Sequence, residues 1–458
     1  MNILRTCCLL LALVLPPLDI GGSWTGRLDG SSFSGTVDLV FSAPDGAWAG
    51  DAVFRSGPNE VRSPLTDIAC DGNALTFSAT IEGAAVHFEG QLSGDVLTGR
   101  FRVLEGGKTL DEGPWSVARG GAIAPVEVSA EARLQPGEAR AVVTAAADAL
   151  RRRYVDAAKG EALAAAIESR LSAGAYERVE DGRVLADLVG RDLFAVAGDR
   201  HLKLSFSPDP LPPEAPDVPE SPADREALSD ALRTGNYGFR KVEILPGNVG
   251  LLEMSRFDRA DLAGEAASLA MGFLQNCDAL IIDLRTCAGG DPAMVACLAS
   301  WLFDGPATLV AEMYRREDDL TVQWWTSPWV PHRRLARVPV RILTASRTFS
   351  AAEALAFHLQ SLGRAQVVGE RTGGGAHPSR RLRLADRFTI TVPTSRAYDP
   401  ATRADWEGLG VRPDVEAPAE DALRVAHAGL LEQLALEAQD PAQAAELRQI
   451  EESVRGEH

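Results

Sequence analysis

Ser350 is the residue whose surroundings most clearly allow chemistry. The β-branched run at Val338–Thr344 predicts a buried strand, and the helical spacing of apolar residues over Ala351–Leu362 predicts a helix that stops at Gly363. Ser350 therefore stands where a strand turns over into a helix N-terminus. Backbone N–H groups and the positive end of the helix dipole meet at such a turn, and they suit a nucleophile whose product is an oxyanion.

The same residues also have a purely structural interpretation. Ser350-Ala-Ala-Glu353 matches a capping box, in which a serine and a glutamate satisfy the free N–H groups at a helix start. On this stretch alone, capping is the commoner explanation. The nucleophile hypothesis therefore depends on whether the rest of the chain supplies a base, an acid and a site for an oxyanion.

A glycine-rich turn follows another predicted strand. Ala279–Leu284 is a nearly continuous apolar run, as a buried parallel strand requires, and Gly289 and Gly290 lie in the turn after it. Pro292 then opens a predicted helix. Because ligand sites in parallel sheets lie beyond the carboxyl ends of the strands, we expect the two glycines and Ser350 to share that edge.

Histidine is the usual base beside a serine nucleophile, and three histidines are candidates. His201 precedes the alternating run Leu202–Phe206, which predicts a strand with His201 on its opposite face. His377 follows a run of three glycines. His358 lies eight residues beyond Ser350 on the same predicted helix, about 12 Å of rise away, and is the poorer candidate.

Composition narrows the function classes. The chain has 458 residues, enough for about three domains, and a net charge of −18, which argues against nucleic acid or an anionic membrane as partner. The cysteines outside the N-terminal segment form no C-x-x-C pair and have no histidine-rich neighbourhood, so no zinc site, other metal or cofactor is predicted. No lysine follows Lys241.

The N-terminal segment is typical of a secretory signal. One positive charge precedes an apolar run that ends at Pro16-Pro17, which is too short to span a membrane. No Ala-x-Ala cleavage site follows, and a buried N-terminal helix is the alternative. Cys7 and Cys8 stand at the start of the run, unlike a lipoprotein signal. We expect an exported protein, periplasmic or secreted.

The predicted fold class is multidomain, with an all-β module, a small helical domain and an α/β core. Two Trp-x-Gly units resemble β-modules found before some exported bacterial hydrolases; this module could bind a surface or glycan, but a spacer role is favoured. The predicted parts are a signal peptide (1–20), an all-β barrel or sandwich (21–118), a linker (119–136), a helical domain (137–205), a Pro-rich connector (206–237), the α/β core (238–435) and a charged C-terminal helix or tail (436–458).

Four ordered motifs of the core resemble the C-terminal processing (tail-specific) peptidase family. They are Asp283-Leu-Arg-x-x-x-Gly289-Gly290, Thr348-Phe-Ser350-Ala-Ala-Glu353, Val367-Val-Gly-Glu-Arg-Thr-Gly-Gly-Gly375 and Glu407-Gly-Leu-Gly-Val-Arg-Pro-Asp414. The helical stretch is similar to the domain before the core in the branch named for interphotoreceptor retinoid-binding protein. The likeness covers about residues 137–430 and implies a core of crotonase-like ββα character.

The resemblance implies roles for individual residues. Ser350 would be the nucleophile, and the N–H of Ala351 with an N–H of Gly289 or Gly290 would form the oxyanion hole. The likeness of Asp-Arg-His-Leu to the tricorn-like branch implies His201 as base, with Glu407 as its acid partner.

Two positions depart from the family pattern. Many relatives carry a lysine base where this chain has Gly375, and no lysine elsewhere in the core can replace it, which argues against a Ser–Lys dyad. A histidine base is therefore expected, with His377 as the runner-up. Cys287 stands where these peptidases often carry asparagine.

The sequence therefore predicts a serine-type peptidase that cleaves peptides or unfolded tails outside the cytoplasm through a Ser-His-Glu relay. No PDZ-like segment separates the helical unit from the core, so substrate choice stays open. The alternative of a different class is a non-catalytic protein that binds a hydrophobic ligand on the same scaffold. A third possibility is an inactive homologue in which Ser350 only caps its helix.

Overall fold

The computed structural model describes residues 19–30, 34–43, 47–56, 59–81, 84–105, 108–120, 131–177, 179–212 and 220–456. It divides into two compact units. One is formed by the described residues up to Arg140, with Gly174–Asp192 and Leu204–Asp209, and the other by Ala141–Ala173, Leu193–Lys203 and the residues from Pro210 on. Within these ranges no helix has the length and apolar character needed to cross a bilayer.

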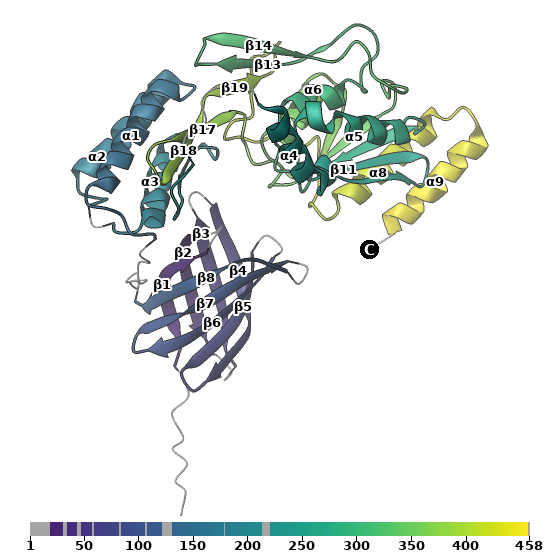
Figure 1. The fold of residues 1–458 in the computed structure, drawn as a ribbon. Helices are drawn as coiled ribbons and strands as arrows, with labels where there is room; N and C mark the ends of the chain where they lie inside the picture. The colour runs from purple at the N-terminus through teal and green to yellow at the C-terminus, as the bar shows by residue number, and fades with distance from the viewer. Residues whose placement is uncertain are drawn as a thin grey trace, which may run out of the picture. The chain divides into compact units, whose positions relative to one another are not determined.

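Eight antiparallel strands form a closed barrel, in which each strand pairs with the next and β1 pairs with β8 (Figure 1). Closure leaves no open sheet edge, which removes the main route to edge-to-edge aggregation. The strands are β1 (Gly22–Asp29), β2 (Ser34–Ser42), β3 (Ala49–Ser56), β4 (Asn59–Asp71), β5 (Ala74–Ile81), β6 (Ala84–Ser93), β7 (Val96–Glu105) and β8 (Lys108–Arg119).

Aromatic side chains fill the barrel interior. Phe77 and Phe88 stack with ring centroids 4.5 Å apart, and Trp115 meets both rings edge-on. Trp24 is fully buried as well, and its indole N–H donates to the carbonyl of Ile20 at 2.8 Å. Inward residues alternate with outward ones along each strand, so the period-two pattern of the sequence becomes a packed core.

Three helices follow the barrel: α1 (Glu138–Arg153), α2 (Ala157–Ser172) and α3 (Gly182–Ala197). Asp156 caps α2 by accepting the N–H of Lys159 at 3.0 Å, as aspartate commonly does at this position. The short strand β9 (Lys203–Phe206) comes next. The sequence placed His201 within this strand, whereas the strand begins two residues later and His201 lies in the turn before it.

The core is a six-stranded sheet in the order β10-β11-β12-β15-β16-β20. Only the β10–β11 pair is antiparallel, and every other neighbouring pair is parallel. The strands are β10 (Phe239–Leu245), β11 (Val249–Met254), β12 (Ala279–Asp283), β15 (Val340–Thr344), β16 (Gln366–Gly369) and β20 (Val415–Glu416).

Helices cover both faces of this sheet (Figure 1). On one face Ile282 and Ile342 pack with residues of α5, α6 and α7, and on the other Ile281 and Leu343 pack with α8 and α9. Burial on both faces explains why these strands are apolar throughout. The helices are α5 (Ala260–Phe273), α6 (Ala293–Ala299), α7 (Ala351–Ser361), α8 (Ala422–Glu437) and α9 (Pro441–Gly456).

The remaining elements surround this core. Strands β13 (Leu309–Arg315), β14 (Leu320–Trp325) and β19 (Ser395–Tyr398) form an antiparallel sheet, and β17 (Ser379–Arg383) pairs with β18 (Phe388–Pro393). Helix α4 (Pro222–Arg233) and the 3₁₀ turn η1 (Asn236–Gly238) precede the core sheet.

The predicted fold class is confirmed: a barrel module, then helices, then an α/β core. The predicted signal peptide lies outside the described residues, apart from its last two positions.

Candidate active site

The β15–α7 connection holds Ser350 in an unusual backbone conformation. Its φ is +53° and its ψ −123°, a region that non-glycine residues rarely occupy and that often marks functional turns. A sharp strand-to-helix turn with a strained serine at its top is the nucleophile elbow of α/β-hydrolases. Thr348 braces the turn, because its hydroxyl donates to the Leu284 carbonyl at 2.8 Å and accepts the N–H of Ala345 at 2.9 Å.

Gly289 lies directly against this turn. A Cβ on Gly289 would sit 2.8 Å from Cβ of Ser350 and 2.7 Å from the backbone nitrogen of Ala351. The φ of Gly289 is +89°, so glycine is needed both for the conformation and for the space. The predicted meeting of the glycine turn and the serine turn at one sheet edge is therefore present.

The glycine turn is fixed by backbone bonds. Phe257 donates its N–H to the Gly289 carbonyl at 2.8 Å and accepts the N–H of Asp291 at 2.7 Å. A Cβ on Gly290 would sit 2.0 Å from the Phe257 carbonyl oxygen, so this position also requires glycine. The Cys287 carbonyl accepts the N–H of Phe349 at 3.2 Å, while its side chain is fully buried. Burial raises the pKa of the Cys287 thiol to about 12, so it stays protonated and serves as packing.

Glu353 is a fully buried carboxylate that joins the serine turn to the glycine loop 373–375. It accepts the backbone N–H of Ser350 at 2.8 Å, of Gly374 at 2.7 Å and of Gly375 at 2.8 Å, and the hydroxyl of Thr372 at 2.5 Å. Burial raises the pKa of Glu353 against the opposing effect of these bonds. The glutamate of the predicted capping box therefore organises more than a helix end.

His201 packs against the residue before the serine. Its ring centroid lies 4.6 Å from that of Phe349, and a Cβ on Gly375 would sit 2.6 Å from Cε1 of His201 and 2.4 Å from Phe349. The space beside position 375 is thus filled by these two rings. Nδ1 of His201 is buried and has no hydrogen-bond partner among the described residues.

Asp199 is the residue that sequence reasoning missed. It is fully buried, and it accepts the backbone N–H of His201 at 3.0 Å and the hydroxyl of Tyr154 at 3.1 Å. Oδ1 lies 3.7 Å from Nδ1 of His201, and Oδ2 lies 3.1 Å from Nδ1 of His377. Burial alone would raise the pKa of Asp199, but the two imidazoles hold it well below its usual range, so Asp199 is ionised. Its place two residues before His201 was the available signal.

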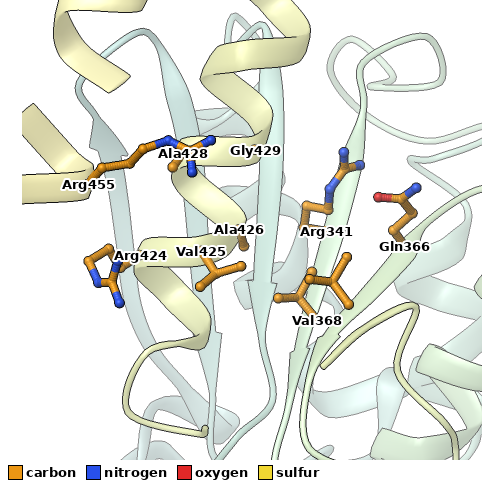
Figure 2. A pocket seen from close by; sticks show the side chains of 10 residues that line it. Arg341, Gln366, Val368, Arg424, Val425, Ala426, Ala428, Gly429 and Arg455 are labelled. Atoms are coloured by element: carbon orange, nitrogen blue, oxygen red, sulfur yellow. The ribbon is translucent and has the colours of Figure 1, made fainter. Parts of the chain in front are cut away.

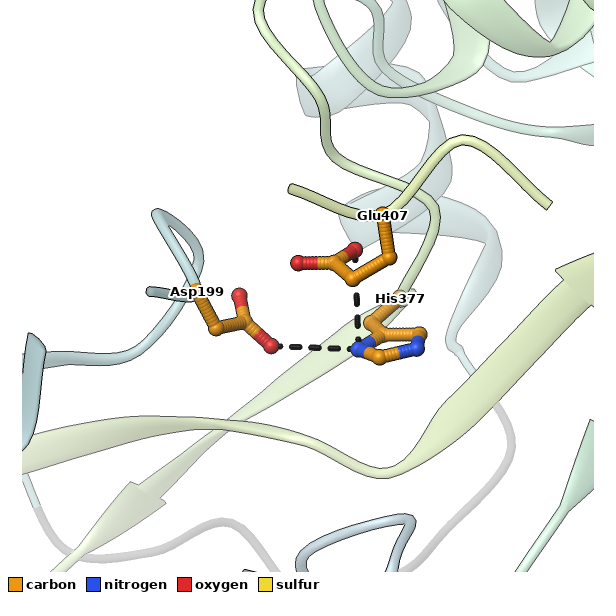
Figure 3. A group of neighbouring side chains, drawn as sticks. All are labelled: Asp199, His377 and Glu407. Atoms are coloured by element: carbon orange, nitrogen blue, oxygen red, sulfur yellow. Dashed lines mark hydrogen bonds and ion pairs between the residues drawn. The ribbon is translucent and has the colours of Figure 1, made fainter. Parts of the chain in front are cut away.

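His377 and Glu407 complete the group. Figure 3 shows the three side chains, with dashed lines from the His377 ring to both carboxylates. Nδ1 of His377 lies 3.5 Å from Oε2 of Glu407, which also accepts the N–H of Ala376 at 2.6 Å. Oε1 of Glu407 is buried without a partner among the described residues. Burial and the charge of Asp199 raise the pKa of Glu407 to about 7, against the opposing charges of the two histidines.

The predicted site residues therefore divide into two sets. Ser350, Ala351 and Gly289 meet at the turn, while His201 and His377 both lie against Asp199. The Glu407 carboxylate pairs with His377, whereas the sequence analysis predicted it as the acid partner of His201. His358 is fully buried, and burial lowers its pKa to about 4, which suits a neutral core residue.

Asp199, His377 and Glu407 are close enough together to be considered as ligands of one metal ion. One ligand atom from each lies within 4.8 Å of the other two, and their types can bind a divalent cation. However, 3.1 Å from Nδ1 of His377 to Asp199 is hydrogen-bond distance, so one imidazole N–H shared by two carboxylates accounts for the arrangement.

A cavity of about 210 Å³ lies away from these groups, against β15, β16 and α8 (Figure 2). Arg424 and Arg455, which line it, are paired with carboxylates of their own helices, at 2.8 Å to Asp421 and 2.6 Å to Glu451. Arg341 donates to the side-chain oxygen of Gln433 at 3.0 Å. This cavity takes no part in the site.

Family comparisons match both parts of the chain that carry this site. The model for peptidase family S41 matches residues 248–417. The model described as the N-terminal domain of peptidase S41 in eukaryotic IRBP matches residues 136–245, and the two together span more than half of the chain. The chain belongs to peptidase family S41. The resemblance seen in the sequence motifs is thereby confirmed.

Solved structures similar to this S41 peptidase include a lipoprotein from Streptococcus agalactiae, 18% identical, with a TM-score of 0.42 over 65% of this chain and 97% of that one. The photosystem II D1 C-terminal processing protease is 18% identical, with a TM-score of 0.39 over 64% of this chain and 94% of that one. The tricorn protease is 13% identical, with a TM-score of 0.37 over 92% of this chain and 46% of that one.

Family membership makes this chain a serine-type peptidase, and its substrate is a peptide or protein. The chemistry needs a nucleophile, a base and donors for an oxyanion, and the described residues offer candidates for each.

Proposed function

We propose that this peptidase cleaves peptides or unfolded protein tails outside the cytoplasm, through an acyl-enzyme on Ser350 with His201 as base and Glu407 as acid partner. The observation that carries the proposal is the strained Ser350 turn, with the Ala351 nitrogen facing the bare Cα of Gly289. A capping serine needs neither the positive φ nor a glycine at that contact.

In the proposed reaction, His201 takes the proton of the Ser350 hydroxyl as the oxygen attacks the substrate carbonyl carbon. The N–H of Ala351 and an N–H of Gly289 or Gly290 would bind the resulting oxyanion. The C–N bond then breaks, His201 gives its proton to the leaving amine, and water releases the acyl group by the same route.

His201 is preferred over His377 as base because it packs on Phe349, the neighbour of Ser350, and contacts the loop that Glu353 ties to the serine turn. His377, in contrast, has both carboxylates at its Nδ1. Asp199 would then act as an ionised anchor between the two imidazoles.

Glu407 is proposed as the acid partner because two buried atoms of the site have no hydrogen-bond partner in the described part of the chain and are complementary. Nδ1 of His201 can donate, and Oε1 of Glu407 can accept. The proposed relay pairs these two atoms once substrate is bound, since catalytic hydrogen bonds are often long before the substrate arrives.

Labelling with a fluorophosphonate probe tests the nucleophile. Wild-type protein should be modified at Ser350, and Ser350→Ala should lose about 10⁴-fold or more in kcat while it keeps its melting temperature. Protein that stays unlabelled at neutral and mildly alkaline pH would favour the alternative of a binding protein for a hydrophobic ligand.

A three-variant comparison on one cleavable peptide tests the base. His201→Ala should lose as much activity as Ser350→Ala, because members of one relay are not additive, and His377→Ala should be much milder. If His377→Ala abolishes cleavage while His201→Ala keeps most of it, the base lies on the 373–377 loop.

A further inference from the structure

Tyr154 is fully buried, and its hydroxyl reaches the carboxylate that lies between the two histidines of the site. The hydroxyl donates to Oδ2 of Asp199 at 3.1 Å. The same oxygen lies 3.1 Å from Nδ1 of His377 (Figure 3), while Oδ1 accepts the backbone N–H of His201 at 3.0 Å. The tyrosine and both histidine segments therefore meet on one carboxylate.

The Tyr154 hydroxyl is a donor that stays protonated. Burial, together with the charge of Asp199, raises the pKa of Tyr154 well above its usual range. In the proposed reaction the His201 imidazole takes up and releases a proton, so the charge beside Asp199 changes from step to step. A buried carboxylate that loses its donors is costly, and Tyr154 supplies one that is the same at every step.

The backbone of Tyr154 is fixed at the point where α1 ends. Arg316 donates to the carbonyl of Tyr154 and to that of Arg151, the latter at 2.8 Å. A guanidinium at these carbonyls offsets the negative end of the helix dipole. The next residue, Val155, donates its N–H to the carbonyl of Pro393, at the end of β18, at 2.8 Å.

The connection between β18 and β19 also holds the His377 loop. Thr394 lies in this connection, and its N–H donates to the carbonyl of Pro378 at 3.0 Å. Pro378 directly follows His377. The carbonyl of Thr394 accepts the backbone N–H of Arg316 at 3.1 Å. The tyrosine and the imidazole are thus attached to one segment of backbone, and they approach the shared carboxylate from fixed directions.

We propose that Tyr154 is a positioning residue for the peptidase reaction. Its hydroxyl fixes the Asp199 carboxylate and, through it, the rings of His201 and His377. Tyr154 takes no part in the making or breaking of bonds. The inference rests on the proposed peptidase function of the same site and deepens it, because it gives the helical domain a role in orienting the proposed base.

Tyr154→Phe tests the inference, because it keeps the ring and removes only the hydroxyl. We expect kcat to fall about tenfold with KM changed less than about twofold, since the imidazoles lose their alignment while the contacts that bind substrate stay. Steady-state kinetics on one cleavable peptide measure both constants.

Tyr176→Phe is the matched control. Tyr176 is 1% exposed, and its hydroxyl donates to Oδ2 of Asp192, which is not part of the proposed site, at 2.6 Å. Both variants lose a buried tyrosine–aspartate bond, so their melting temperatures should fall by similar amounts, but only Tyr154→Phe should lower kcat. Equal kcat values for the two variants would overturn the inference and leave the proposed function standing.

Histidine-selective nitrogen NMR separates the inference from the proposed function. The ring-nitrogen signals of His201 and His377 report the hydrogen bonds of these rings whether or not the protein cleaves a peptide. They should move in Tyr154→Phe and stay in place in Tyr176→Phe. If they move while the wild-type protein cleaves nothing, the proposed function fails, and the role of Tyr154 in orienting the rings stands. Unmoved signals overturn the inference.

Discussion

The backbone N–H of Ser350 donates to Oε2 of Glu353 at 2.8 Å, and the same oxygen accepts the N–H of Gly375 at 2.8 Å. One buried carboxylate therefore fixes the serine turn relative to the loop that His201 packs against. The strained φ of Ser350 persists because this bond and the packing around it over-determine the turn. Glu353 is a positioning residue for the proposed nucleophile.

Glu353→Gln should impair activity more than folding. The amide nitrogen of glutamine would face backbone donors, leaving some of them unsatisfied at about 1–3 kcal/mol of unfolding free energy. A shift of the turn by a fraction of an ångström should lower kcat by about 10²-fold, with less change in KM. Denaturant titration and steady-state kinetics measure both. Glu416→Gln, with a side chain 75% exposed, is the control, and equal kinetics of the two variants would contradict the positioning role.

Gly289→Ala should reduce kcat by about 10²–10³-fold, the cost of disturbing an oxyanion donor. Its new Cβ would sit 2.7 Å from the Ala351 nitrogen and 2.5 Å from the Phe349 carbonyl oxygen, inside the proposed oxyanion hole. Gly305→Ala is a close control, because Gly305 has a φ of +88° with nothing within 4 Å of its Cβ position. Both variants strain the backbone, but only Gly289→Ala crowds the site. Similar kcat values for the two would remove Gly289 from the hole.

The sequence predicted the elements around the site because their patterns are local. Apolar strands, the capping residues near Ser350 and the glycines at 289 and 290 each follow from short-range rules, and the parallel sheet brings their ends together. The resemblance to the peptidase family rested on the order of four motifs along the chain, which no single motif could provide.

The arrangement of the histidines could not be predicted in the same way. Asp199, His377 and Glu407 are far apart in the chain, and which carboxylate meets which imidazole depends on long-range packing. The hydrogen bond from Tyr154 to Asp199 and the one from the Gly374 N–H to Glu353 also depend on long-range packing.

The position of signal cleavage is a further prediction, although residues 1–18 lie outside the described range. Ile20 and Trp24 are fully buried in the barrel core, and the Trp24 indole bonds the Ile20 carbonyl. Removal of either residue would open the core, so an exported mature chain should begin at or just before Ile20, slightly earlier than the signal-peptide end at residue 20 that the sequence alone predicted. N-terminal sequencing of the protein from its native compartment measures this. An intact Met1 on cytosolic material would contradict export.

The pKa of Glu407 gives a prediction for stability against pH. Burial and the charge of Asp199 raise it from 4.5 to about 7, so between these values the folded state keeps a proton that the unfolded chain has released. Stability from this group is complete below about pH 4.5 and is lost as pH rises to about 7, by on the order of 3 kcal/mol. The charges of His377 and His201 and the hydrogen bond from the Ala376 N–H lower the pKa of Glu407, and the value of about 7 already includes their effect.

Glu407→Gln should remove this loss, because glutamine stays neutral like the protonated acid. The variant and the wild-type protein should have similar unfolding free energies near pH 4.5. The variant should then become the more stable of the two as pH rises, with the difference levelling off above about pH 8. Urea titrations of both proteins at pH 5, 6, 7 and 8 measure the difference, with Glu416→Gln as an exposed control. A difference that does not change between pH 5 and 8 would show that Glu407 is ionised over this whole range, and would contradict a raised pKa at this carboxyl.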